Sequence, residues 1–140
     1  EACGGARAMR EAMKEAGYSE SDVVYVNAHG TGTPMNDVVE TKAIKNALGE
    51  EAAQKAYVSS TKSMTGHSLG AAGVQEAIYS VLMMQNDFIA PNINVTELDE
   101  GAKGYDIVLE KRDAKLNTVM SNSFGFGGVN ACLVFKKWQG

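Results

Sequence analysis

Short apolar runs alternate with helical patterns along the first 84 residues of the chain. From residue 5 to residue 16 the apolar residues recur at helical spacing, and Gly17 provides a helix stop. Val23 to Ala28 is an apolar, β-branched run without polar alternation, as expected for a strand that is covered on both faces. A second short strand is predicted at Ala56 to Ser59.

Two further helices are predicted, one after each of these strands. Asp37 followed by Glu40 resembles a capping box, and apolar residues then line one helical face up to Gly49. The segment from Ala71 to Met84 is apolar nearly all the way round, which is typical of a buried helix. Helices that alternate with short buried strands in this order indicate a parallel sheet in an α/β fold.

The final third of the chain changes character. The segments GYDIVLEKR, LNTVMSNSF and NACLVFKKW are each predicted to be a strand, and GFGG joins the last two. A glycine-rich link of this length suits a hairpin, so antiparallel strands are expected to complete the sheet. The pattern therefore predicts an α/β fold with a mixed, mostly parallel sheet and antiparallel final strands. The 140 residues are the size of one domain.

Composition narrows the classes of function. A hydrophobic content of 44% and a charged content of 21% fit a globular protein. The net charge of −4 argues against a protein that binds nucleic acid by neutralising phosphates, and no apolar run reaches membrane-spanning length. Cys3 and Cys132 lack metal-site or disulfide-framework spacing, and neither is expected to be a nucleophile.

The two histidines of the chain follow the two predicted buried strands. His29 and His67 each lie beside glycines, directly after an apolar segment. Parallel strands end at one edge of a sheet, where open α/β sheets place their ligands, so we expect both histidines at one rim. The loop from residue 122 to residue 128 reaches that rim only if its strand also runs parallel, which the pattern does not decide.

Paired imidazoles at one rim suit a small set of chemical tasks. They can donate hydrogen bonds to a developing oxyanion, act as general acid or base, or bind a metal. Metal is the weaker alternative because no carboxylate or cysteine accompanies either histidine at ligand spacing. Ordinary turn histidines without a chemical role are the further alternative. The loop HGTGTP lacks the lysine of a phosphate loop and the third glycine of a dinucleotide fingerprint, so nucleotide binding is not expected.

Two charged residues are candidates to accompany the histidines. Glu76 interrupts an otherwise apolar helix, and a buried carboxylate needs a cationic or hydrogen-bonding partner. Lys62 is the nearest candidate, and it would add positive potential near His67. The alternative places Glu76 at an exposed helix edge and Lys62 in solvent.

Three motifs together resemble a known enzyme family. NAHGTGTP, TKSMTGHSLGAAG and SNSFGFGG, in this order, resemble the β-ketoacyl-acyl carrier protein synthases of the thiolase-like condensing enzymes, and the resemblance covers essentially the whole chain. The stretch from GHSLGAAGVQEAIYS through FIAPNIN to VMSNSFGFGG is most similar to the bacterial type I elongating enzyme. Gly32 and Val129 depart from that subtype, which usually has serine and threonine there.

The resemblance implies an architecture and an assembly. Each subunit of the family has two similar halves stacked into an α/β/α/β/α sandwich, and residues 1–140 are similar to most of the C-terminal half, without the half that carries the nucleophilic cysteine. A chain that begins at Glu1 without an initiator methionine agrees with a fragment. The implied partners are an acyl carrier protein and the N-terminal half of the same polypeptide, in a cytoplasmic homodimer. The fragment alone is expected to be inactive.

The resemblance also implies a reaction, a decarboxylative Claisen condensation of malonyl and acyl thioesters, as in fatty acid elongation. His29 and His67 would hold the malonyl thioester oxygen and stabilise the enolate, and Lys62 would pair with Glu76. Phe126 would be a gating residue whose backbone N–H completes the oxyanion hole. No resident cofactor is implied, because the phosphopantetheine arm belongs to the carrier protein.

The remaining implied site residues support substrate or ion binding. Thr31 and Thr33 would hydrogen-bond the phosphopantetheine arm, and Gly125 and Gly127 would let the backbone around Phe126 approach the substrate. Four residues resemble a cluster that holds a monovalent cation in some members of the family, namely Asn27, Glu76, Ser121 and Asn122. Two other readings stay open, a non-catalytic ketosynthase-like partner subunit and a two-histidine metal-binding module.

Overall fold

The computed structural model describes residues 2–32, 34–93 and 105–138. The α-helices are α1 (Ala2–Ala16), α2 (Pro34–Leu48), α3 (Glu50–Lys55), α4 (Lys62–Thr65) and α5 (Ala72–Asn86), and the short 3₁₀ helices are η1 (Glu20–Asp22), η2 (Leu69–Ala71) and η4 (Phe126–Gly128). The strands are β1 (Tyr25–Asn27), β2 (Tyr57–Ser59), β3 (Phe88–Ile89), β4 (Asp106–Ile107), β5 (Arg112–Asp113), β6 (Thr118–Phe124) and β7 (Asn130–Lys136).

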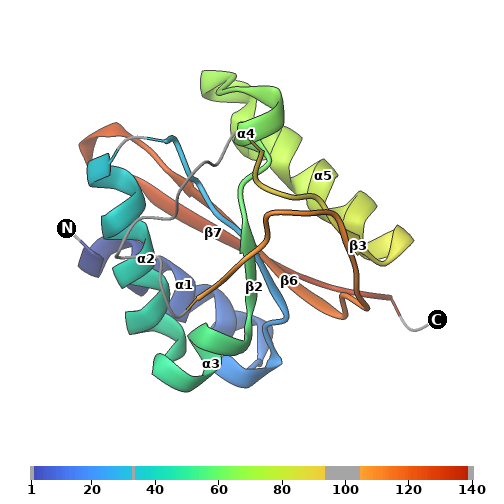
Figure 1. Ribbon diagram of the computed structural model, residues 1–140. Helices are drawn as coiled ribbons and strands as arrows, with labels where there is room; N and C mark the ends of the chain where they lie inside the picture. Colours follow the sequence, from blue (N-terminus) through green and yellow to red (C-terminus); the bar gives the residue numbers. More distant parts are fainter. Residues whose placement is uncertain (1, 33, 94–104, 139–140) are drawn as a thin grey trace.

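A five-stranded sheet with the order β4-β2-β1-β6-β7 forms the centre of the fold (Figure 1). β1 pairs in parallel with both β2 and β6, and β2 pairs in parallel with β4. β7 runs antiparallel to β6 in a hairpin. The predicted fold class, a mostly parallel sheet completed by antiparallel strands, is therefore confirmed. β3 and β5 form a separate antiparallel pair.

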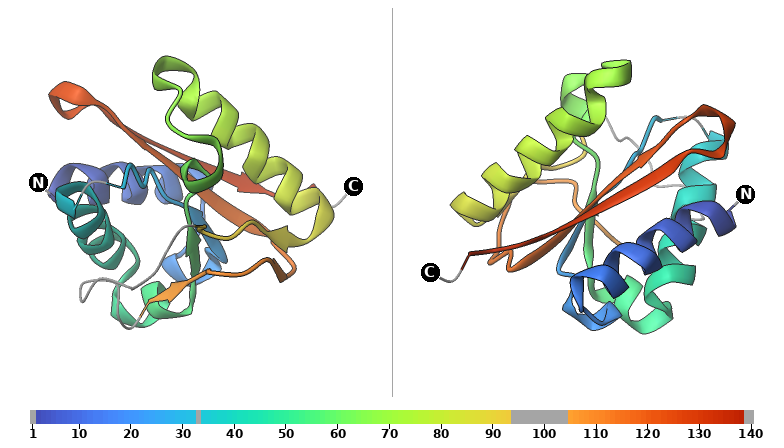
Figure 2. Two further views of the ribbon diagram at one scale, coloured as in Figure 1. Left: turned by 45° about the horizontal axis from the view of Figure 1, so that its top comes forward. Right: turned by 180° about the vertical axis from the view of Figure 1, so that it is seen from behind.

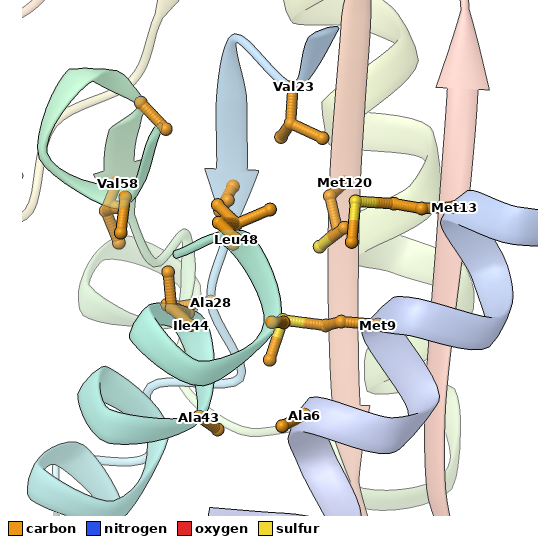
Figure 3. Close-up of a cluster of buried hydrophobic side chains, with 14 residues drawn as sticks. Ala6, Met9, Met13, Val23, Ala28, Ala43, Ile44, Leu48, Val58 and Met120 are labelled. Carbon is orange, nitrogen blue, oxygen red and sulfur yellow. The ribbon is translucent and has the colours of Figure 1, made fainter. Parts of the chain in front are cut away.

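Helices cover both faces of this sheet (Figure 2). α1 and α2 lie on one face and α5 on the other. Successive strand residues point to opposite faces, so Val26 and Met120 join the α1–α2 cluster while Tyr25 and Val119 join the cluster beneath α5. Figure 3 shows methionines of α1 and aliphatic side chains of α2 gathered around Met120. Burial on both faces explains why the strand sequences lack polar alternation.

The first two helices begin earlier than the sequence pattern predicts. α1 begins at Ala2 rather than residue 5, and α2 begins at Pro34. Proline suits the first helical position because its fixed φ is helical and its missing N–H has no acceptor there. Asp37 consequently lies inside α2, and the capping box predicted for Asp37 and Glu40 is wrong.

The segment GYDIVLEKR does not form the single strand that was predicted. It contributes β4 to the large sheet and β5 to the small one. Arg112 joins the two through Nη1, which donates to both carboxylate oxygens of Asp106 at 3.0 Å, and its guanidinium lies 5.0 Å from the ring centroid of Tyr57. The strand is interrupted because its two ends pair with different partners.

One face of α5 is exposed, contrary to the prediction of a wholly buried helix. Val74, Ile78 and Leu82 are 67%, 53% and 46% exposed, at successive i, i+4 positions. They line a shallow apolar groove together with Gly73, Ala77, Val81 and Leu133. An apolar sequence pattern indicates that a helix face is buried, but it does not indicate which part of an assembly covers that face.

Candidate active site

The carboxyl ends of β1, β2 and β6 bring together three loops that are far apart in the sequence. Asn27 at the end of β1 lies in register with Ser59 of β2 and with Ser121 of β6. His29 follows β1 by two residues, and Lys62 opens α4 just beyond β2. Since β6 runs parallel to β1, the chain beyond Ser121 reaches the same rim, which answers the question that the sequence pattern left open.

The structure brings the two histidines into contact. Their ring centroids lie 5.6 Å apart with an interplanar angle of 89°, so the rings meet edge to face. His29 is buried and His67 is exposed. The ring of Phe124, in the last position of β6, lies 5.9 Å from that of His29. All three loops therefore contribute to one site.

Lys62 is a buried ammonium group that contacts three acceptors. Its Nζ donates to Oε1 of Glu76, to the carbonyl oxygen of His29 at 2.7 Å, and to Nδ1 of His29 at 3.3 Å. The side chains of Lys62 and Glu76 are 4% and 3% exposed, which confirms that Glu76 is buried and paired with Lys62. An ammonium has three hydrogens, so these contacts use its full donor capacity.

Hydrogen bonds determine which nitrogen of each histidine carries its proton. Lys62 can only donate, so Nδ1 of His29 is an acceptor and the neutral ring carries its hydrogen on Nε2. The backbone N–H of Leu69 donates to Nδ1 of His67 at 3.2 Å, which gives His67 the same tautomer. With Nδ1 as the acceptor, each ring in its neutral form presents an Nε2–H donor, as a site that binds a developing oxyanion requires.

Burial and neighbouring charges keep His29 uncharged. Burial is the largest cause, and the charges of Lys62 and then His67 add to it, so the pKa of His29 falls to about 4. Burial raises the pKa of Glu76, while the hydrogen bond and the charge of Lys62 lower it. We take the Lys62–Glu76 contact as an ion pair because the ammonium donates directly to the carboxylate.

Glu40 is a site residue that the sequence pattern misassigned. Its Oε1 accepts the backbone N–H of His29 at 2.7 Å, and its Oε2 accepts that of Gly30 at 2.8 Å. The side chain is buried, which raises its pKa against the lowering by these hydrogen bonds. Glu40 therefore reaches back from α2 and fixes the loop that carries His29. The only sequence feature that distinguishes it is a carboxylate within an amphipathic helix.

The four residues of the predicted cation cluster lie around the end of β1. Nδ2 of Asn27 donates to Oγ of Ser80 at 3.3 Å, one helical turn beyond Glu76 in α5, and Oδ1 of Asn27 accepts the N–H of Thr61 at 3.4 Å. Within the described part of the chain, two buried oxygens have no hydrogen-bond partner, Oε2 of Glu76 and Oδ1 of Asn122. These two oxygens lie on opposite faces of the sheet, because Asn122 donates to the sulfur of Met9 in α1 whereas Glu76 belongs to α5.

Metal ligation by several acidic, cysteine or histidine side chains finds no support in the described residues. No group of three or more His, Cys, Asp or Glu among residues 2–32, 34–93 and 105–138 is arranged to hold a metal ion. Across the same ranges, no helix is long and apolar enough to cross a membrane.

The structure locates some of the remaining predicted site residues, and others lie outside the part of the chain that it describes. Thr31 is half-buried in the loop after His29, whereas Thr33 lies outside the described residues. Gly125, Phe126 and Gly127 form the turn of the β6–β7 hairpin, where Gly125 donates its N–H to the carbonyl oxygen of Val129 at 2.7 Å. Gly127 has φ of 78°, a left-handed conformation that favours glycine. The ring of Phe126 is outside the described side chains, so its gating role stays a prediction.

Comparison with known proteins identifies a family and its relatives. The family described as beta-ketoacyl synthase, C-terminal domain, matches residues 1–96. The 3-oxoacyl-[acyl-carrier-protein] synthase 1 of Haemophilus influenzae is 56% identical over 138 residues, and that of Escherichia coli K12 is 54% identical over 134 residues. These alignments cover 98% and 96% of this chain but 32% of each relative, so the chain spans about a third of their length.

Solved structures agree with this match. A beta-ketoacyl synthase from Burkholderia phymatum STM815 superposes with a TM-score of 0.91 at 40% identity, covering 99% of this chain and 33% of that one. A ketosynthase in complex with its type II polyketide synthase acyl-carrier protein gives a TM-score of 0.92 at 34% identity, covering 99% of this chain and 34% of that one.

Proposed function

This chain belongs to the beta-ketoacyl synthase family through its C-terminal domain, and on that premise we propose that it is the C-terminal half of a 3-oxoacyl-[acyl-carrier-protein] synthase. The full-length protein would catalyse the decarboxylative condensation that elongates fatty acids. The single observation that carries the proposal is the His29–His67 pair, in which both Nδ1 atoms accept hydrogen bonds and both Nε2–H groups remain as donors.

The chemistry of decarboxylation fits these donors. When the bond between Cα and the carboxylate of a malonyl thioester breaks, CO₂ leaves and the electron pair moves onto the thioester oxygen as an enolate. Two Nε2–H donors aimed at that oxygen stabilise the negative charge more strongly than they stabilise the neutral carbonyl. A protonated His29 ring would carry a hydrogen on both nitrogens, so its Nδ1 could no longer accept from Lys62. The lowered pKa of about 4 keeps the ring neutral near pH 7.

Condensation also requires a nucleophilic cysteine, which we assign to the N-terminal half of the protein. The enolate carbon would attack an acyl thioester on a cysteine of the N-terminal half, forming the carbon–carbon bond of a 3-oxoacyl thioester and releasing the cysteine thiolate. Thr31 and Thr33 would hold the phosphopantetheine arm of the acyl carrier protein. The occurrence of a ketosynthase–carrier complex among the structural relatives supports a carrier partner.

The N-terminal half would cover the exposed face of α5. Val74, Ile78 and Leu82 form a continuous apolar stripe, and removing such a stripe from water is favourable by about 25 cal/mol per Å² of apolar area. The family is also the basis on which we propose a cytoplasmic homodimer. A monovalent cation would be held on the α5 face of the sheet by the free oxygen of Glu76 together with Asn27 and Ser121, whereas the side chain of Asn122 faces α1.

Histidine substitutions in the full-length protein test this assignment. His29→Ala and His67→Ala should each abolish CO₂ release from malonyl carrier protein, while acyl transfer to the cysteine survives in part. Unimpaired decarboxylation in either variant would remove the assigned roles. Acyl loading also tests the alternative of a non-catalytic partner subunit, because a protein without the cysteine takes up no acyl group.

A further inference from the structure

A short segment, residues 90–93, binds the chain at the end of β2 and in α4. Oγ of Ser59 donates to the carbonyl oxygen of Ala90 at 2.8 Å, and the N–H of Ile93 donates to Oγ of Ser63 at 3.1 Å. These two contacts attach the segment on both sides of Ser60, where β2 ends and the turn into α4 begins.

Asn92, in the middle of this segment, occupies the place where β2 and β4 stop pairing. The N–H of Val108 still donates to the carbonyl oxygen of Val58 at 2.9 Å. In a continuing parallel ladder, the next bond would run from the N–H of Ser60 to the carbonyl of Val108. Instead, Ser60 donates to Oδ1 of Asn92 at 2.9 Å, and Nδ2 of Asn92 lies 3.4 Å from the carbonyl oxygen of Val108.

The side chain of Asn92 therefore takes the place of a peptide group. Its carboxamide accepts from one strand and donates to the other, and its own backbone N–H also donates to Val108 at 2.8 Å. A carboxamide is the side-chain group that reproduces both the donor and the acceptor of a peptide. The two strands are held apart by one side chain at the rim where the site lies.

Ser60 connects this arrangement to the site. Oγ of Ser60 lies 3.5 Å from the carbonyl oxygen of His29 and 3.4 Å from that of Gly30. Two residues further along, Lys62 donates to the same carbonyl oxygen of His29. The position of the Ser60 backbone thus affects how Lys62 meets His29.

We propose that Asn92 is a positioning residue, which substitutes for strand backbone between β2 and β4 and thereby sets the turn that delivers Lys62 to His29. It acts through Ser60 and touches neither histidine ring. The inference rests on the proposed function insofar as its effect is measured on decarboxylation. It predicts that the polarity of the side chain at position 92, rather than its volume, determines the decarboxylation rate.

Three substitutions in the full-length protein separate polarity from volume. Asn92→Ala and Asn92→Ser are close in size and differ by one hydroxyl, which can both accept and donate. Asn92→Leu restores volume without polarity. Asn86→Ala is the control, because the Asn86 side chain is exposed and donates only within its own helix, to the carbonyl of Leu82 at 2.8 Å.

The measured quantities are the rates of malonyl decarboxylation and of acyl transfer, the thermal midpoint, and hydrogen exchange in residues 57–66. Asn92→Ala and Asn92→Leu should slow decarboxylation by about tenfold or more, as small misplacements of catalytic groups do, with acyl transfer much less affected. Asn92→Ser should recover most of the loss. The Ser60 amide should exchange faster in the alanine and leucine variants.

Equal decarboxylation rates for the alanine and serine variants, or full recovery by leucine, would overturn the inference. Failure of the wild-type protein to decarboxylate would instead count against the proposed function. In that case the exchange of the Ser60 amide still decides whether Asn92 holds the turn, since unchanged protection in Asn92→Ala refutes it. If the leucine variant does not fold, the alanine–serine pair alone gives the same comparison.

Discussion

The ammonium group of Lys62 lies 2.7 Å from the carbonyl oxygen of His29 and 3.3 Å from Nδ1 of its ring. One side chain thus fixes both the backbone and the tautomer of the same histidine. Because the ammonium also donates to Glu76, its charge is partly balanced within the site. The contact links the pKa of His29 to the presence of Lys62.

The pKa of His29 should rise when Lys62 is replaced by methionine. The charge of Lys62 is the second cause, after burial, of the lowering to about 4, and its removal also leaves the negative charge of Glu76 unbalanced. NMR titration of the His29 ring should report about 4 in the wild-type protein and a higher value in Lys62→Met. An unchanged pKa would show that Lys62 does not influence the ring.

The lowered pKa of His29 also predicts that the folded protein loses stability in acid. The folded-state pKa of His29 lies below its unfolded value of 6.5, so the unfolded chain binds more protons between those two values. The contribution of His29 should therefore lower the free energy of unfolding as the pH falls from about 6.5 to about 4. Urea midpoints measured across this range should fall less steeply in His29→Gln than in wild type.

The buried ion pair should tolerate removal of both partners better than removal of one. Lys62→Met leaves the carboxylate of Glu76 buried without its cation, which should cost about 3–5 kcal/mol of unfolding free energy. Lys62→Met with Glu76→Leu should recover much of that stability in urea unfolding. Decarboxylation should stay low in the double variant, because the donor to His29 is still missing. Additive losses in the double variant would contradict the pairing.

Glu40→Gln should loosen the loop that carries His29. An amide offers one acceptor where the carboxylate offers two, so the N–H of His29 or Gly30 loses its partner. A buried unsatisfied group costs about 1–3 kcal/mol, which urea unfolding should detect along with slower decarboxylation. Glu15→Gln is the exposed control in α1 and should change stability by less than about 0.5 kcal/mol.

Gly30→Ala should be more damaging than Gly32→Ala. Both glycines have positive φ, 49° and 82°, so alanine at either position costs about 1–2 kcal/mol in a left-handed conformation. A Cβ at Gly30 would also lie 2.5 Å from Cβ of Ser60, whereas a Cβ at Gly32 meets nothing within 4 Å. Comparable unfolding midpoints for the two variants would show that the loop relaxes away from Ser60.

Ile78→Lys should impair the full-length protein through the α5 groove. Ile78 is 53% exposed in this chain, so a lysine there is easily accommodated by α5 itself. If the N-terminal half covers the groove, the lysine becomes buried without a partner and the full-length protein should lose several kcal/mol of stability. Ala16→Lys, at the exposed last position of α1 on the other side of the fold, serves as a comparison. Equal stability of Ile78→Lys and wild type would mean that the groove remains open to solvent.

Topology made much of the site predictable from the sequence. His29 and His67 follow strands of a pattern that indicates a parallel sheet, and parallel strands place such residues at one rim. The pairing of Lys62 with Glu76 was one of two alternatives that the residues left open, since a carboxylate in an apolar helix either is paired or lies at an exposed edge. The meeting of the histidines follows from the order of elements, whereas the pairing of Lys62 with Glu76 depends on packing that buries the carboxylate.

Other features depend on packing and were not predictable. The donors to the Glu40 carboxylate are backbone N–H groups 10 and 11 residues upstream, and its spacing from Asp37 equally matches a helix cap. The positioning role of the Asn92 carboxamide can be inferred only once the structure has placed β2 and β4 beside it. The division of GYDIVLEKR between two sheets likewise follows from strand partners that no local pattern specifies.

The strand order has a consequence for how the domain forms as it is synthesised. β6 comes late in the chain, yet it lies in the interior of the sheet, paired with β1 about 90 residues upstream. Such long-range pairing is slow to form because a long loop must close first. A nascent chain that ends before Thr118 therefore has both histidines but presents one edge of β1, including the backbone of Asn27, without its neighbour. The rim therefore cannot form until β6 has been synthesised, so its assembly comes late in the folding of this part of the chain.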